Sequence, residues 1–135
     1  MESSGNVVGG SNTVDRNFIG GNIGFGVYML ESNAFNNAVI GNYIGTGISE
    51  AKGFGHSFGI RIVSSANNNQ IGGPNVAEGN LIVGSTSVGV AITSSSSNRV
   101  TGNRIGRSLA GNTIPNQVGV FIEGSSSNNT VGGTN

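Results

Sequence analysis

The sequence contains no cysteine, few charged residues and no long apolar run. Without cysteine the chain can form no disulfide, no thiol nucleophile and no thiolate-ligated metal site. Only 9% of its 135 residues are charged and the net charge is zero, whereas nucleic-acid binding needs clustered Lys and Arg. No segment approaches the roughly 20 apolar residues of a membrane span, and the N-terminal residues lack a signal-peptide pattern. We therefore expect neither nucleic acid nor a membrane as a partner, and the cellular compartment stays open.

An internal repeat of about sixty residues is the strongest pattern that the sequence does contain. The segment NVVGGSNTVDRNFIGGNIGFGV at residues 6–27 aligns without a gap with NQIGGPNVAEGNLIVGSTSVGV at residues 69–90. A third copy, NTVGGTN, begins at Asn129. Repeats of this length indicate stacked supersecondary units. The sequence thus predicts a single domain built from tandem repeats at residues 6–68 and 69–128, with a third repeat begun at residue 129.

Short apolar triplets bounded by Gly or Asn recur in three sets along the chain. Alternation with a period of two over so few residues is typical of short strands. The first set is Val27-Tyr28-Met29, Ile60-Arg61-Ile62, Val90-Ala91-Ile92 and Val120-Phe121-Ile122; the second begins at Asn37, Asn69, Asn98 and Asn129, and the third at Asn17, Asn42, Asn80 and Asn103. Three strand sets in a fixed order predict an all-β parallel β-helix of about four coils, each strand pairing with its counterpart one coil away.

The alternation also predicts the direction of the side chains. Arg61, Arg99 and Arg104 each occupy the middle of a triplet, which points outward if the flanking aliphatic residues point inward. Asn suits the corners between strands because it tolerates left-handed backbone conformations and its amide can bond to the equivalent amide in the next coil. We expect an inward-facing ladder of Asn17, Asn42, Asn80 and Asn103.

The recurring segments N-x-(I/V)-x-G-N-x-I-G and G-V-x-I resemble those of bacterial right-handed parallel β-helix proteins, which share the pectin-lyase-like fold. The resemblance extends over residues 6–133 and implies a right-handed solenoid of three short strands per coil. This fold hosts polysaccharide lyases, hydrolases, epimerases and inert structural modules. Polygalacturonases of this group use an Asp cluster, a Gly-His-Gly segment and an Arg-Ile-Lys segment. Gly55-His56-Ser57 and Arg61-Ile62-Val63 match only fragments of these segments, and the only Asp is Asp15.

Candidate catalytic and metal-binding groups are sparse. Asp15 and Glu78 occupy equivalent positions in the two repeats, and glycoside hydrolysis needs two carboxylates that face one bond. We favour the alternative that each is a solvated acid in the turn that precedes an Asn. No segment supplies the several oxygen ligands of a calcium site or a phosphate-binding loop. We expect no catalytic site, no metal and no cofactor.

Several outward positions are candidates for binding. The third strand set places Phe18, Tyr43 and Leu81 on adjacent coils as an exposed apolar column, and the first set places Tyr28, Arg61 and Phe121 outward. His56, the only His, lies in the loop 46–58, where we expect a solvated imidazole. A stacked apolar column is typical of a protein contact, which we favour over a platform for sugar rings. In the alternative, the loops 46–58 and 107–118 cover the column.

The ends of the predicted solenoid suggest its function. A terminal coil exposes unpaired backbone groups and an apolar cross-section, and neither end of the sequence has the pattern of a cap. We therefore expect a non-catalytic structural or interaction module that forms homo-oligomers through coil ends, the outward apolar column, or both. The competing hypothesis is a carbohydrate-binding or carbohydrate-active domain that uses the face around Tyr28, Arg61, His56 and Phe121. In another alternative, the chain is a fragment of a longer exported or cell-surface bacterial protein.

Overall fold

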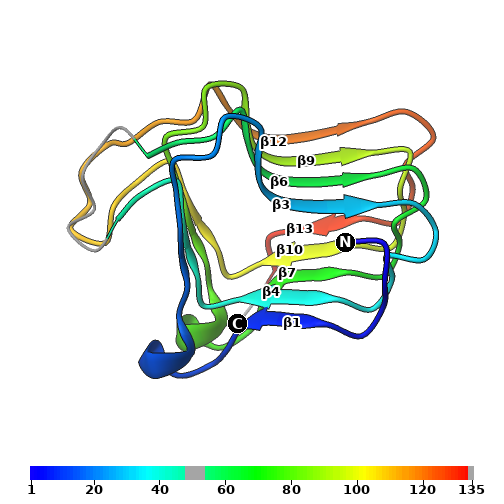
Figure 1. Ribbon diagram of the computed structural model, residues 1–135, viewed down its shortest axis with the longest axis horizontal. Helices are drawn as coiled ribbons and strands as arrows, with labels where there is room; N and C mark the ends of the chain where they lie inside the picture. Colours follow the sequence, from blue (N-terminus) through cyan, green and yellow to red (C-terminus); the bar gives the residue numbers. More distant parts are fainter. Residues whose placement is uncertain (48–53, 134–135) are drawn as a thin grey trace.

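The computed structural model describes residues 1–47 and 54–133 and forms a parallel β-solenoid (Figure 1). Short strands from successive coils pair side by side into three parallel sheets. Each of four coils contributes one strand to every sheet, and a fifth coil is begun at the C-terminal end. The prediction of an all-β solenoid with about four coils and three strands per coil is thus confirmed.

The three sheets are named here in the order in which the chain visits them. The first sheet contains β1 (Val7–Gly9), β4 (Ala38–Ile40), β7 (Gln70–Gly72), β10 (Arg99–Thr101) and β13 (Thr130–Val131). The second contains β2 (Phe18–Ile19), β5 (Tyr43–Ile44), β8 (Leu81–Ile82) and β11 (Arg104–Ile105). The third contains β3 (Phe25–Leu30), β6 (Phe58–Val63), β9 (Val88–Thr93) and β12 (Val118–Glu123).

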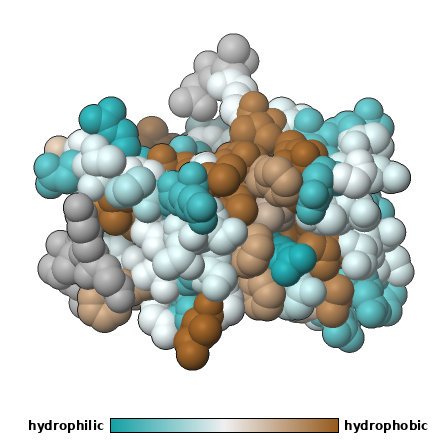
Figure 2. Space-filling model, turned by 90° about the horizontal axis from the view of Figure 1, so that it is seen from above, coloured by the Kyte–Doolittle hydropathy of each residue, from teal (hydrophilic) through white to brown (hydrophobic). Residues whose placement is uncertain are grey.

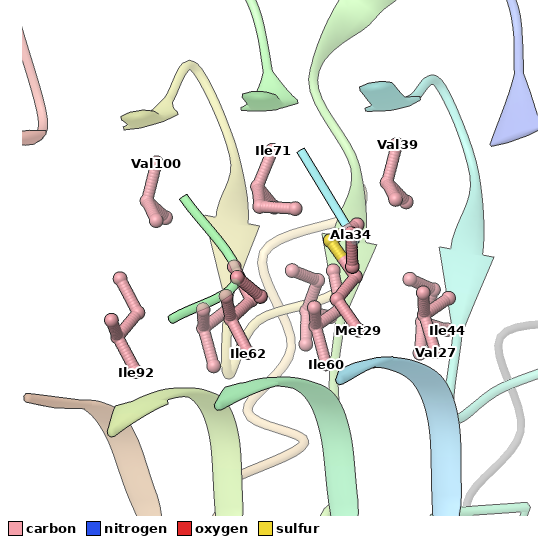
Figure 3. Packing of buried hydrophobic residues seen from close by; sticks show 13 residues of the cluster. Val27, Met29, Ala34, Val39, Ile44, Ile60, Ile62, Ile71, Ile92 and Val100 are labelled. Atoms are coloured by element: carbon pink, nitrogen blue, oxygen red, sulfur yellow. The ribbon is translucent and has the colours of Figure 1, made fainter. Parts of the chain in front are cut away.

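The core consists of aliphatic columns that run along the solenoid axis. In the third sheet Met29 pairs with Ile62, and Ile62 pairs with Ile92, so side chains of equal direction stack without a shift in register. These three side chains are fully buried. Figure 3 shows that they point toward Val39 and Ile71 of the opposite first sheet. Burying one such side chain stabilises the fold by about 1.5–3 kcal/mol, so the aligned columns account for much of the stability.

Alternate coils differ in where they depart from the strand pattern. The first and third coils contain a 3₁₀ turn between the first and second sheets, η1 (Thr13–Asp15) and η2 (Val76–Glu78). The second and fourth coils pass this corner with only Gly and Asn, but have more residues between the second and third sheets, at 45–57 and 106–117. Figure 1 shows the described parts of these segments projecting from the stack. The structure therefore alternates between two kinds of coil.

Close contact between coils requires glycine at some corners. Gly45, which follows β5, has a φ of +89°, and a Cβ placed there would lie 1.8 Å from the carbonyl oxygen of Val83. A side chain at this corner would both strain the backbone and overlap the next coil.

Candidate functional site

Two ladders of asparagine side chains run the length of the solenoid. The ladder predicted at Asn17, Asn42, Asn80 and Asn103 is present: the Nδ2 of each residue donates to the Oδ1 of the next, over 2.8–3.2 Å. Asn42 and Asn80 are buried. A second ladder, which we did not expect, joins Asn6, Asn37, Asn69, Asn98 and Asn129 in the same way.

Both ladders have the same direction. In each step the backbone N–H and the Nδ2 of one Asn donate to the Oδ1 of the Asn one coil later, as between Asn98 and Asn129. Within the described part of the chain, the Oδ1 atoms of Asn6 and Asn17 consequently receive no hydrogen bond. At the other end, the backbone N–H groups of Asn103 and Asn129 find no acceptor among those residues. The solenoid thus has an acceptor end at its first coil and a donor end at its last.

The donor end also exposes the apolar core. Ile122 lies directly above the fully buried Ile92 in the same column, yet 41% of its surface is exposed. Val131 is 49% exposed although Val100, its partner in β10, is only 2% exposed. These side chains point inward, so their exposure comes from the open end of the stack.

The acceptor end is partly covered by the N-terminal residues. The amino group of Met1 donates to the carbonyl of Tyr28, and the N–H of Leu30 donates to the carbonyl of Met1 over 2.9 Å. This is the hydrogen-bond pattern of a parallel strand opposite Met29. The Met1 side chain packs against the core cluster. Met1 therefore occupies part of the free edge of β3, while the N–H of Gly5 donates to the carbonyl of Phe35 over 3.2 Å.

The outward face of the third sheet carries an aromatic cluster. The rings of Phe25 and Tyr28 stack with centroids 4.4 Å apart, and the guanidinium carbon of Arg61 lies 4.8 Å from the centroid of Phe58 and 5.5 Å from that of Phe25. The Nε of Arg61 is buried, and none of the described residues forms a hydrogen bond with it. Figure 2, which shows the molecule from above the third sheet, shows apolar side chains gathered near the middle of this face.

A depression of about 310 Å³ adjoins this cluster. Its floor contains Ala91, which lies in register between Arg61 on one side and Phe121 on the other. The small side chain of Ala91 leaves a hollow between the larger neighbours, and Phe58 and Glu123 also line it. The depression therefore combines aromatic walls with one cationic and one anionic side chain.

The predicted apolar column on the second sheet is exposed only at one end, so this prediction is largely wrong. Phe18 is 45% exposed, but Tyr43 is 8% and Leu81 only 2% exposed. The guanidinium of Arg16 lies 4.3 Å from the Tyr43 ring centroid, and its Nη1 donates to the Tyr43 hydroxyl. Leu81 belongs to a small apolar cluster with Ile114. The loop 107–118 thus contributes to the cover, whereas residues 48–53 of the other loop lie outside the described residues.

The prediction that His56 is solvated is wrong as well. His56 is 1% exposed, its Nδ1 lies 3.1 Å from the carbonyl oxygen of Asn22, and its Nε2 lies 3.0 Å from that of Ile19. The imidazole therefore connects the second coil to the first, because both carbonyl groups belong to the first coil. It does not lie on the binding face that the sequence suggested, whereas Tyr28, Arg61 and Phe121 do.

The two acids at equivalent positions each stabilise their own turn. Asp15 accepts a hydrogen bond from the Nδ2 of Asn12, and Glu78 accepts one from the backbone N–H of Asn75. Among residues 1–47 and 54–133, no three His, Asp or Glu side chains are close enough to hold a metal ion. The same residues include no helix that is long and apolar enough to span a membrane.

We compared the chain with protein-family models, with curated proteins and with solved structures, and none of the three comparisons gave a match.

Proposed function

We propose that the chain is a non-catalytic β-solenoid interaction module that associates with itself through its coil ends. The observation that carries this proposal is the open apolar end: Ile122 and Val131 continue columns that are buried one coil earlier, but are themselves 41% and 49% exposed. The free edge of β12 also presents unpaired backbone groups, which favour the addition of a further strand. A second coil end covers both features.

Sedimentation velocity over a micromolar concentration series tests this proposal. Ile122→Lys places a charge on the open end and should shift the association toward monomer by at least about tenfold in concentration. Val76→Lys is the matched control, because Val76 is 93% exposed on η2 in the third coil, away from both ends. A wild-type chain that stays monomeric throughout, or equal association of both variants and wild type, contradicts the proposal.

A second candidate function is the binding of a polysaccharide in the depression on the third sheet. Support comes from the resemblance of the repeats to bacterial pectin-lyase-like proteins and from the arrangement of Phe58, Arg61 and Phe121 around Ala91. Aromatic side chains offer apolar faces on which sugar rings can lie, and a guanidinium can bind a carboxylate through two hydrogen bonds. An acidic sugar unit fits both features.

Isothermal titration with a panel of acidic polysaccharides tests this second candidate. Saturable binding should be lost in Arg61→Ala and retained in Arg99→Ala, whose side chain is exposed on the first sheet. Equal binding by both variants, or no binding by the wild type, contradicts a site at Arg61. Shortening of the polysaccharide by the wild type contradicts the proposal that the module is non-catalytic.

A further inference from the structure

A hollow of about 560 Å³ lies on the outward side of the second sheet, beside η2. Tyr43 of β5, Leu81 of β8 and Arg104 of β11 line it and occupy paired register positions, so the hollow extends over three coils. Figure 1 shows that η2 projects from the corner between the first and second sheets. Val76 of η2 and Leu109 of the loop 107–118 also line the hollow. Its volume lies within the range of about 300–1,000 Å³ that is typical of small-molecule sites.

The hollow occurs at a difference between the two repeats. Arg16 of the first repeat aligns with Gly79 of the second. The side chain of Arg16 extends over the second coil, where its Nε donates to the carbonyl of Gly41 over 3.0 Å and its Nη1 to the Tyr43 hydroxyl over 3.1 Å. Gly79 has no side chain that could cover Arg104 of the fourth coil in this way, and it lines the hollow. The second repeat therefore leaves open a space that the first repeat fills.

Three side chains in the hollow have free hydrogen-bond donors. The Nη2 of Arg16 and the Nε and Nη2 of Arg104 donate to none of the described residues, and the hydroxyl of Tyr43 accepts a bond from Arg16 but donates to none of them. The acids next along the chain, Asp15 and Glu78, each accept a hydrogen bond within their own turns, and no described Asp or Glu lines the hollow. Two guanidinium groups without a carboxylate beside them in the hollow favour an anionic ligand.

Apolar surface separates the two guanidinium groups. The guanidinium of Arg16 lies over the Tyr43 ring, with its carbon 4.3 Å from the ring centroid. Arg104 lies two strands away from Tyr43, which corresponds to about 10 Å between their backbones. Leu81 lies on the strand between them, and the exposed side chain of Val76 lines the same hollow. A ligand that reaches both cations must therefore have an apolar body between two anionic groups.

We propose that this hollow binds a small organic dianion, in which an apolar body about 10 Å long joins two carboxylate groups. One carboxylate accepts hydrogen bonds from the Nη2 of Arg16 and the hydroxyl of Tyr43, and the other accepts from the guanidinium of Arg104. Such bonds between charged partners are about twice as strong as neutral ones. The apolar body contacts Val76 and Leu109, whose exposed side chains it removes from water. The site is independent of the coil ends and of the depression on the third sheet.

Isothermal titration with three carboxylates tests the site without any substitution. Azelate is a linear dicarboxylate whose extended length matches the separation of about 10 Å. Nonanoate has the same chain length but one carboxylate, and succinate has two carboxylates but a chain too short to reach both guanidinium groups. We expect saturable binding of azelate, and binding of nonanoate and succinate that is at least about tenfold weaker, because each loses one hydrogen-bonded charge pair.

Arg104→Gln distinguishes direct contact with the ligand from a structural role. The single carboxylate of nonanoate takes the end with Arg16 and Tyr43, where more donors are free. If Arg104 binds the second carboxylate, the variant should therefore bind azelate only as weakly as nonanoate, and nonanoate as well as the wild type does. Arg99→Gln is the matched control, because Arg99 is exposed on β10 of the first sheet, and this variant should keep the preference for azelate.

The proposed site is wrong if the wild type binds no azelate, or binds nonanoate or succinate as tightly as azelate. It is also wrong if Arg104→Gln weakens azelate and nonanoate by the same factor, or if Arg99→Gln abolishes the preference for azelate. Circular dichroism of both variants shows whether the fold is retained, and the comparison of the three carboxylates stands even if Arg104→Gln fails to fold. None of these outcomes bears on self-association, which sedimentation velocity measures separately.

Discussion

The buried amide of Asn80 is a demanding test of how the solenoid is stabilised. Its Nδ2 donates to the carbonyl of Val39 and to the Oδ1 of Asn103, each over 2.8 Å, and its Oδ1 accepts the backbone N–H of Asn42 over 2.9 Å. Asn80→Ala leaves the buried N–H of Asn42 without this acceptor. It also removes the hydrogen bond that the buried carbonyl of Val39 accepts from the Nδ2 of Asn80. Each such buried group costs about 1–3 kcal/mol, so we expect the loss of two to lower the free energy of unfolding by about 2–6 kcal/mol.

Urea-induced unfolding, followed by far-ultraviolet circular dichroism at a concentration where the chain is monomeric, measures this change. With a slope of about 2 kcal/mol per molar urea, a loss of 4 kcal/mol lowers the midpoint by about 2 M. Asn17→Ala is the control in the same ladder. Asn17 is exposed, and its backbone N–H still donates to the Oδ1 of Asn42 after the substitution. That variant should lose only about 1 kcal/mol. Equal losses in both variants would refute the reasoning, as would a loss below about 1 kcal/mol in Asn80→Ala.

Three further substitutions test other contacts by the same urea assay. Gly45→Ala places a Cβ 1.8 Å from a carbonyl oxygen and should cost more than about 3 kcal/mol, whereas Gly21→Ala, also at positive φ but in open space, should cost about 1 kcal/mol. His56→Leu removes the imidazole contacts to the carbonyl oxygens of Asn22 and Ile19 and should cost about 1–3 kcal/mol while leaving self-association unchanged. Leu81→Ala should cost about 2–4 kcal/mol because its side chain is buried, and Phe18→Ala, at the exposed end of the same column, less than about 1 kcal/mol. Equal costs within either pair, or an unchanged midpoint in His56→Leu, would contradict these assignments.

The sequence predicted the backbone arrangement because repetition constrains it directly. An Asn precedes every strand of the first and second sheets, and this recurring pattern of Asn and aliphatic residues leaves few ways to bury the aliphatic side chains other than stacked coils. The ladder through Asn42 and Asn80 followed from the same pattern. The ladder through Asn37 and Asn69 has an identical signal, an Asn directly before each strand of the first sheet, from which it could have been predicted in the same way.

The sequence did not predict which outward side chains are covered, because cover comes from segments that are not repeated. Leu81 lies at an outward strand position, and its burial depends on Ile114, which belongs to an insertion present in only some coils. His56 follows a segment rich in Gly, which suggested an exposed side chain. Close packing of the coils instead places its ring nitrogens within hydrogen-bond distance of two carbonyl oxygens of the first coil. The local sequence pattern determines whether a side chain points inward or outward, whereas the path of a long loop determines whether an outward side chain is exposed.

The alternation of two kinds of coil has a consequence for how such a chain can vary in length. Because a coil with a 3₁₀ turn always faces a coil with a tight corner, the smallest unit that can be copied without disturbing the glycine contacts is a pair of coils. Duplicating residues 69–128 would lengthen the protein by two strand spacings, about 10 Å, and leave every junction of the kind already present. The length of such a solenoid therefore changes in steps of two coils.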